Sequence, residues 1–364
     1  VFVSSFDMNC MQNDTSLLSR TISFLRFPMI FFILYLHVVL RGWSDGHMVP
    51  GSVFFGYESV RFFFVESVSR IFVPCFFFIS GFLFFYYSDF SGRVYIEKMK
   101  RRFRSLLVPY LFWNFFVIAL YFLGQSLISS MVSEETKLVA DFAWKDWLMC
   151  FWNISDGAPI NLPLWFLRDL IGLSILSPLI YWVVRHSRIF AVVFIGVLWF
   201  LWGTPTHYLV GLFFFTGGAW LGICKINPIE RLLPYRRIFL LLYLCVMPVG
   251  VLMLLNDVSA GIYLQKIGIL LGLCTVFSWS ARWLQNRRFE MPVLEKSSFF
   301  VYAYHGLPLL FLSKLVAFYL HPDASWKLIA LFLVLPVVIS IIGVIAYVLI
   351  NRYFPRFSYW ISGR

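Results

Sequence analysis

The chain has 364 residues, of which 60% are hydrophobic and only 13% are charged, and its mean hydropathy is +0.81. A water-soluble core does not need so many apolar side chains, and the 43 Phe, 18 Tyr and 14 Trp residues are typical of a lipid-facing surface. The formal net charge of +12 would suit a nucleic-acid-binding protein, but the basic residues gather in alternate short loops between apolar runs. The composition therefore indicates a polytopic membrane protein whose partners include membrane lipids and exclude nucleic acid.

Apolar runs of about 17 residues or more predict ten transmembrane helices. They lie at 21–41, 66–88, 105–129, 164–184, 189–204, 207–224, 237–255, 262–280, 298–320 and 327–350. The fifth and sixth runs are so close that they can form a tight helical hairpin. The predicted fold is all-α, a polytopic membrane helix bundle of about ten transmembrane helices. We expect one integral-membrane domain at 21–350, between tails at 1–20 and 351–364.

The distribution of Lys and Arg predicts the orientation of this bundle. The loop after the second run carries six basic residues, and more follow in every second loop and in the last segment. The opposite loops hold few, and the long one at 130–163 is rich in acidic residues. Because cytoplasmic loops carry the excess of Lys and Arg, both tails are predicted to be cytoplasmic.

Arg26 and His37 stand in one apolar run, TISFLRFPMIFFILYLHVVL, with ten residues between them. On a helix, eleven steps make three turns plus about 20°, so both side chains share one face, roughly 16 Å apart. Ionisable groups at such depth usually point into a protein interior or a water-filled cavity. His37 is interpreted as a base for a hydroxyl nucleophile, or as a histidine that only bonds across helices. Arg26 either holds an anionic donor or developing negative charge, or anchors the helix at the interface.

The second run offers two further candidates. Arg70 follows Glu66 by four residues, a spacing that permits an ion pair on one helix face as well as a role in a site. Ser80 precedes Gly81 in FFFISGF, and this small-residue pair allows close approach of either a helix or a ligand.

Polar groups also occur in the fourth and ninth runs. In NLPLWFLRDL, Pro163 is expected to precede the helix. Trp165 either lines the acceptor site or lies in an aromatic belt, and Arg168 and Asp169 either pair or line a cavity. His305, in VYAYHGLPLL, is a second intramembrane histidine. The Gly and Pro that follow it are expected to break the helix where it lines a cavity.

A basic cluster follows the second run in KMKRRFRSLLVPY. Its cations, which include Arg102 and Arg104, suit anionic lipid or the phosphates of a nucleotide-bearing donor. The six cysteines show neither CxxC nor other metal-ligand spacing, and no P-loop, GxSxG or HExxH motif occurs, so no metal is expected.

Four segments together resemble the acyltransferase-3 family, integral-membrane enzymes that acylate cell-surface glycans and related acceptors in bacteria. In chain order they are Arg26-x10-His37, FFFISGF with RRFRSLLVPY, PLWFLRDL, and VYAYHGLPLL. The resemblance implies that His37 is catalytic, that Arg26 is its motif partner, and that Arg102 and Arg104 help to hold the donor. His305 stands at a position where relatives show less uniform residues.

The resemblance also implies the reaction and its location. We expect O-acylation, most simply O-acetylation, by cytoplasmic acyl-CoA (acetyl-CoA) of a hydroxyl on a cell-surface or lipid-linked glycan, such as an exopolysaccharide of the cell envelope. The protein would lie in the bacterial inner (plasma) membrane as a membrane-only member, without the soluble esterase-like domain of some relatives. His37 would act as base or as acyl carrier. A transporter or flippase without bond chemistry is the main alternative, and a scaffold protein is the third.

Overall fold

A computed structural model describes residues 17–38, 40, 54–127, 137–153, 157–203, 208–287, 289–320 and 324–363, and these residues form helices and connections without a strand. The first half contains α2 (Leu17–Leu34), η1 (Tyr35–His37), α3 (Phe55–Ser67), η2 (Ser69–Ile71), α4 (Phe72–Tyr86), α5 (Gly92–Arg102), η3 (Phe103–Leu107), α6 (Val108–Leu127), η5 (Val139–Asp141), α7 (Trp144–Trp152), η6 (Leu162–Leu164), α8 (Trp165–Ile175) and α9 (Ser177–Ser187). The second half contains α10 (Ile189–Trp202), α11 (Tyr208–Ile223), α12 (Pro228–Leu232), η7 (Leu233–Tyr235), α13 (Arg236–Leu255), α14 (Gly261–Leu284), α15 (Pro292–Tyr304), α16 (Gly306–Leu320), α17 (Ser325–Tyr353) and α18 (Pro355–Ile361).

Helices occupy the position of every predicted transmembrane run, which confirms the all-α polytopic bundle. In the described part of the chain, six helical segments are long and apolar enough to cross a membrane, or eight if each of two bent pairs counts as one span. The bent pairs are Leu162–Ile175 with Ser177–Ser187, and Pro292–Tyr304 with Gly306–Leu320. The fifth and sixth runs are α10 and α11, which contact each other but are shorter than the roughly 20 residues of a typical span.

The second and third helical segments begin more than ten residues earlier than hydropathy predicts. The second begins at Phe55 rather than at 66, because α3 carries Glu58, Arg61 and Glu66 and so is less apolar than the helix that follows. The third begins at Gly92, where the hydroxyl of Ser91 accepts a hydrogen bond from the Val94 amide and caps α5. Helix α5, GRVYIEKMKRR, carries five basic residues and one acidic residue, so an apolar-run criterion detects only the α6 part.

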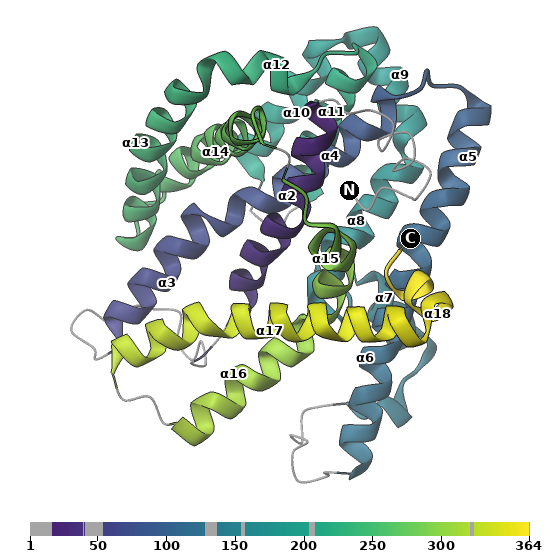
Figure 1. Ribbon diagram of the computed structural model, residues 1–364, viewed down its shortest axis with the longest axis vertical. Coiled ribbons are helices and arrows are strands. Elements are labelled where there is room, and N and C mark those ends of the chain that lie inside the picture. Colours follow the sequence, from purple (N-terminus) through teal and green to yellow (C-terminus); the bar gives the residue numbers. More distant parts are fainter. Residues whose placement is uncertain are drawn as a thin grey trace.

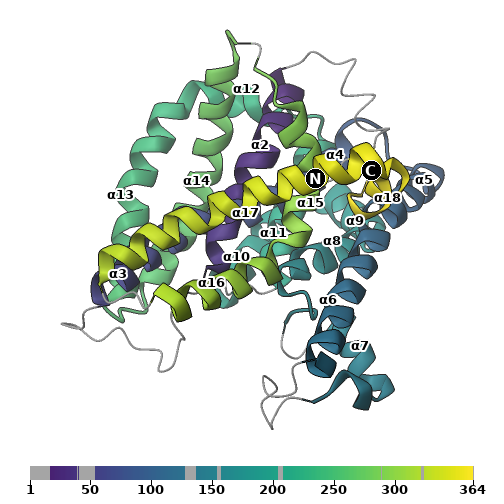
Figure 2. The same cartoon turned by 60° about the horizontal axis from the view of Figure 1, so that its bottom comes forward.

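The bundle is built on close helix pairs (Figure 1). Helix α4 lies along α11, and a Cβ atom at Gly218 would overlap the carbonyl oxygen of Phe78. The missing side chain is therefore what lets the two backbones approach so closely. In Figure 2, α13, α14, α2 and α15 run side by side in that order, and α17 crosses them obliquely.

The outward surfaces carry the apolar side chains expected to face lipid. Phe190 on α10, Leu241 on α13 and Ile341 on α17 are all exposed. An exposed apolar surface of this extent is unfavourable in water and favourable in a bilayer. The chain is thus a multi-pass membrane protein.

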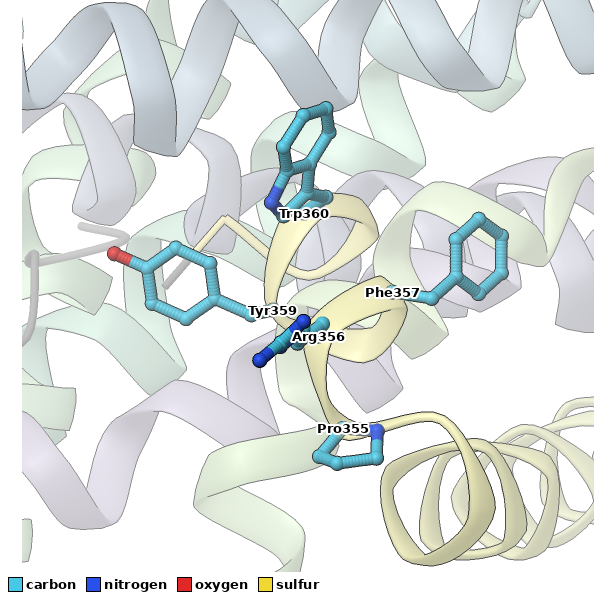
Figure 3. A pocket seen from close by; sticks show the side chains of 5 residues that line it. All are labelled: Pro355, Arg356, Phe357, Tyr359 and Trp360. Atoms are coloured by element: carbon cyan, nitrogen blue, oxygen red, sulfur yellow. The ribbon is translucent and has the colours of Figure 1, made fainter.

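The last segment of the chain packs against the bundle. The Trp113 indole donates a 3.0 Å hydrogen bond to the Ile361 carbonyl, which holds α18 to α6. A hollow of about 490 Å³ at α18 is lined by Pro355, Arg356, Phe357, Tyr359 and Trp360. Figure 3 shows their side chains spread in different directions around the helix rather than converging. Exposed aromatic groups with an arginine are typical of a membrane interface, not of a ligand site.

Candidate active site

Two histidines from distant parts of the chain meet inside the bundle. The rings of His37 and His305 lie with their centroids 5.2 Å apart and their planes at 54°. His305 is fully buried, and His37 is partly exposed. The predicted pair of Arg26 and His37 lies on one helical segment, but the α-helix ends at Leu34 and His37 closes a 3-10 turn. His37 therefore stands at the end of its span.

The local sequence explains why His305 lies at a junction between two helices. Helix α15 ends at Tyr304 and α16 begins at Gly306, with a bend of 67° between them, as the Gly and the Pro after His305 predicted. A Cβ atom at Gly306 would lie 2.8 Å from Pro163 Cγ, so this close approach favours glycine. The bend places His305 at a helix junction.

The backbone selects one tautomer of His305. Its Nδ1 lies 2.6 Å from the Tyr302 carbonyl oxygen, which can only accept a hydrogen bond. In the neutral ring Nδ1 therefore carries the hydrogen, and Nε2 keeps its lone pair. Among the described groups, this buried Nε2 has no hydrogen-bond partner. Such an atom is unfavourable for stability and suits a site that binds or moves a proton.

A polar shell anchors the end of α15. The Tyr302 hydroxyl donates to the Pro163 carbonyl at 2.5 Å, and the Asn161 amide donates to the Ala303 carbonyl at 3.1 Å. The Asn161 backbone in turn donates to the side chain of Asn114 at 3.1 Å. Sequence reasoning missed both asparagines, since a single Asn near a span has no distinctive spacing.

Arg26 forms an ion pair with Glu295. The distance from Nη1 to Oε1 is 2.9 Å, and Arg26 is only 7% exposed, so it is buried within the protein. Sequence reasoning did not identify Glu295, because it lies 269 positions further along the chain.

Arg70 lies on an element next to His37. The 3-10 turn η2, which contains Arg70, contacts η1, which contains His37. The predicted ion pair is present: Arg70 bonds to both carboxylate oxygens of Glu66 at 2.9 Å, and Gln265 bonds to one of them at 2.8 Å. Arg70 thus belongs to a polar network at the edge of the histidine pair.

Three further residues that the sequence indicates as site candidates make an ion pair or packing contacts. Arg168 pairs with Asp169 at 2.7 Å and donates to the Asn153 carbonyl at 2.8 Å, so the predicted pairing is confirmed. Trp165 packs on Phe77, with ring centroids 6.4 Å apart. Ser80 is fully buried in α4, next to the glycine at which α11 packs.

Arg102 and Arg104 line one hollow of about 720 Å³. Its other lining residues are Met99, Lys100, Phe103, Leu106, Leu107, Ile171, Ser174 and Ile175. A single π-helical turn, η3, runs through this wall, and such turns are frequent at functional sites. The volume is in the range of small-molecule sites, and the cations suit phosphate groups.

Helix α8 connects the two regions. Pro163, just before it, contacts the histidine junction, and Ile175, at its end, lines the basic hollow. The eleven residues of α8 correspond to about 16 Å. No group of three or more His, Cys, Asp or Glu side chains suited to a metal occurs among the residues that the structure describes.

The family model for an acyltransferase domain matches residues 20–350. The chain belongs to the acyltransferase-3 family. It is also 32% identical over 177 residues to the succinoglycan biosynthesis protein ExoH of Rhizobium meliloti (strain 1021). That similarity covers 47% of this chain and 45% of the relative, so the chain spans about half the length of the relative that it matches. No solved structure matches the acyltransferase-3 chain described here.

Proposed function

We propose that this protein is a membrane O-acyltransferase that moves an acyl group, most simply acetyl, from acyl-CoA to a hydroxyl of an exopolysaccharide or of its lipid-linked precursor. The observation that carries the proposal is the meeting of His37 and His305, at 5.2 Å, within a chain of the acyltransferase-3 family. The name of the Rhizobium relative, a succinoglycan biosynthesis protein, supports a polysaccharide acceptor.

The donor would bind with its phosphates in the hollow of Arg102 and Arg104. Guanidinium groups bind phosphate through charge-assisted hydrogen bonds. Because α8 spans about 16 Å between this hollow and the histidine pair, an extended pantetheine arm is the part of acyl-CoA suited to bridge the two. The thioester carbonyl would then lie beside His37.

The chemistry requires one group that takes a proton and returns it. A neutral His37 imidazole accepts the proton of the acceptor hydroxyl while the oxygen attacks the thioester carbonyl carbon. The C–S bond breaks, and the departing thiolate takes the proton from the imidazolium, which gives the ester and free CoA. Alternatively the imidazole nitrogen itself attacks, CoA leaves, and the hydroxyl then takes the acyl group from acyl-histidine. His305, whose Nε2 is buried without a partner among the described groups, would orient His37 in either route.

The site implies a place in the cell. A cytoplasmic acyl-CoA and a cell-envelope acceptor put the protein in the bacterial inner membrane, with the basic hollow on the cytoplasmic side. The positive-inside distribution of Lys and Arg supports this orientation and cytoplasmic termini.

The test is release of free thiol from acetyl-CoA and succinyl-CoA by the purified protein in lipid nanodiscs, with extracted exopolysaccharide as acceptor. Wild type should release thiol in proportion to acylated product, and His37→Ala should lower the rate by about 10²-fold or more, the usual contribution of a positioned base. The matched control is Asp146→Asn, which removes an exposed ion pair with Lys137.

Each outcome decides between the alternatives. Equal release by wild type and His37→Ala would contradict the role of His37 but retain the enzyme. No release by either protein would contradict acyl transfer and favour a transporter.

A further inference from the structure

Two contacts join the segment of α2 and η1 to the segment of α15 and His305: one in the middle of α2 and one at the end of η1. Arg26 Nη1 lies 2.9 Å from Glu295 Oε1, and the rings of His37 and His305 lie 5.2 Å apart. Eleven positions separate Arg26 from His37, and ten separate Glu295 from His305. With a rise of 1.5 Å per residue in the α-helices and about 2 Å in the 3-10 turn Tyr35–His37, these separations are about 18 and about 15 Å. The two segments therefore run in the same direction with similar spacing between their contacts.

Because both contacts lie between the same two helical segments, a change in one contact affects the other. If α2 slid along α15 by one residue, both the ion pair and the histidine contact would change together by about 1.5 Å. The ion pair is the stronger constraint, because an arginine that is 7% exposed needs a counter-charge in a low-dielectric interior. The side chain of Glu295, 26% exposed, supplies that charge.

The sequence of α2 shows why such a constraint is needed there. Pro28 lies inside the helix, two residues after Arg26. A proline in a helix interior removes a backbone hydrogen bond and permits a kink. The Arg26–Glu295 ion pair is a lateral tie close to Pro28, and the Tyr35 hydroxyl, which donates to the Leu333 carbonyl at 3.2 Å, is a second tie at the far end of the segment.

We propose that Glu295 is a positioning residue of the acyl-transfer site. By holding Arg26, it fixes α2 against α15 and thereby the approach of His37 to His305. This inference rests on the proposed acyl transfer. It also changes the interpretation of Arg26. Because Glu295 balances the charge of Arg26, this arginine fixes the position of α2 along α15 instead of binding the donor. The donor phosphates would bind in the hollow of Arg102 and Arg104.

The kinetic test uses Glu295→Gln, which removes the charge and keeps the shape. We expect kcat to fall about 10²-fold, the loss typical of misplacement by 1 Å, with the KM for acyl-CoA unchanged. Glu295→Asp, which keeps the carboxylate, should be intermediate. The exchanged pair Arg26→Glu/Glu295→Arg should be at least tenfold faster than either single variant. Asp146→Asn serves as the control for loss of an ion pair elsewhere.

A second measurement is independent of activity and so separates this inference from the proposed function. In a chain with its six cysteines replaced by alanine, His37→Cys and His305→Cys should be joined rapidly by a short bifunctional methanethiosulfonate, which spans the space that the two imidazole rings occupy. Adding Glu295→Gln should slow this cross-linking several-fold.

The inference is overturned by an unchanged kcat in Glu295→Gln, or by an effect confined to the KM for acyl-CoA, which would make Arg26 a donor-binding group. Failure of the exchanged pair to recover activity, or unchanged cross-linking, overturns it as well. If wild type releases no thiol but cross-linking responds to Glu295→Gln, the register argument holds and the proposed function fails.

Discussion

At the scale of single residues, the tautomer of His305 is fixed by backbone and not by another side chain. The Tyr302 carbonyl accepts from Nδ1, and that carbonyl is placed by the last turn of α15. A side-chain substitution at Tyr302 therefore leaves the tautomer intact, and the bend at Gly306 is what presents the ring. Helix geometry, rather than a third catalytic side chain, prepares this histidine.

Arg102 and Arg104 carry a prediction about the donor alone. Replacing both with alanine should raise the KM for acyl-CoA about tenfold or more, since hydrogen bonds to charged groups contribute about 1.5–3 kcal/mol each, and should leave the KM for the acceptor unchanged. Arg93→Ala is the matched control, because Arg93 belongs to the same basic segment but is almost fully exposed and does not line the hollow. Initial-rate kinetics with each substrate varied decide the matter. An unchanged KM for acyl-CoA would mean that the basic cluster sets the orientation of the protein in the membrane and does not bind the donor.

The residue-level predictions from sequence succeeded where spacing along one helix was enough. The pairs Glu66–Arg70 and Arg168–Asp169 are present because four residues, or one, separate their members. Arg26–Glu295 could not be predicted in this way, since it depends on the register of two helices that are far apart in the chain. The contact between His37 and His305 also depends on helices far apart in the chain, so the sequence did not predict it, although it indicated each histidine separately.

At the scale of helices, hydropathy located the apolar segments and missed the polar helical extensions. Helices α3 and α5 carry charged residues and continue the second and third predicted runs towards their N-termini. The break at His305 was predictable, because Gly and Pro leave a sequence signature. The bend between α8 and α9 was not predicted, although Pro178 begins the second of these helices.

The close packing of α4 on α11 makes a prediction about stability. Gly218→Ala would place a Cβ atom on the Phe78 carbonyl oxygen, so the two helices must separate, and we expect a loss of about 1–3 kcal/mol. Gly124→Ala is the control: nothing lies within 4 Å of its added Cβ atom in α6, and alanine favours a helix by about 0.5–1 kcal/mol. Thermal unfolding of both variants in detergent should show opposite shifts. A destabilised Gly124→Ala, or an unaffected Gly218→Ala, would contradict the packing described.

At the scale of the whole molecule, the basic connections gather together in space. The Lys225 ammonium donates to the Tyr86 carbonyl at 2.6 Å, which joins the connection after α11 to the one after α4. Arg20, at the start of α2, donates to the carbonyls of Leu284 and Arg287 after α14. Since these segments were assigned to the cytoplasmic side by charge alone, their proximity supports one common side for the basic loops.

This arrangement predicts which side each connection faces. In a chain with its native cysteines replaced, Asp141→Cys, between α6 and α7, should react with a membrane-impermeant maleimide in intact spheroplasts. Glu97→Cys, on α5 beside the basic hollow, should react only after the membrane is opened. Both positions are exposed, so a difference in labelling reports sidedness rather than burial. The reverse pattern would place the Arg102 and Arg104 hollow outside the cell, where acyl-CoA is not supplied, and the proposed donor would then be wrong even if His37 proved essential.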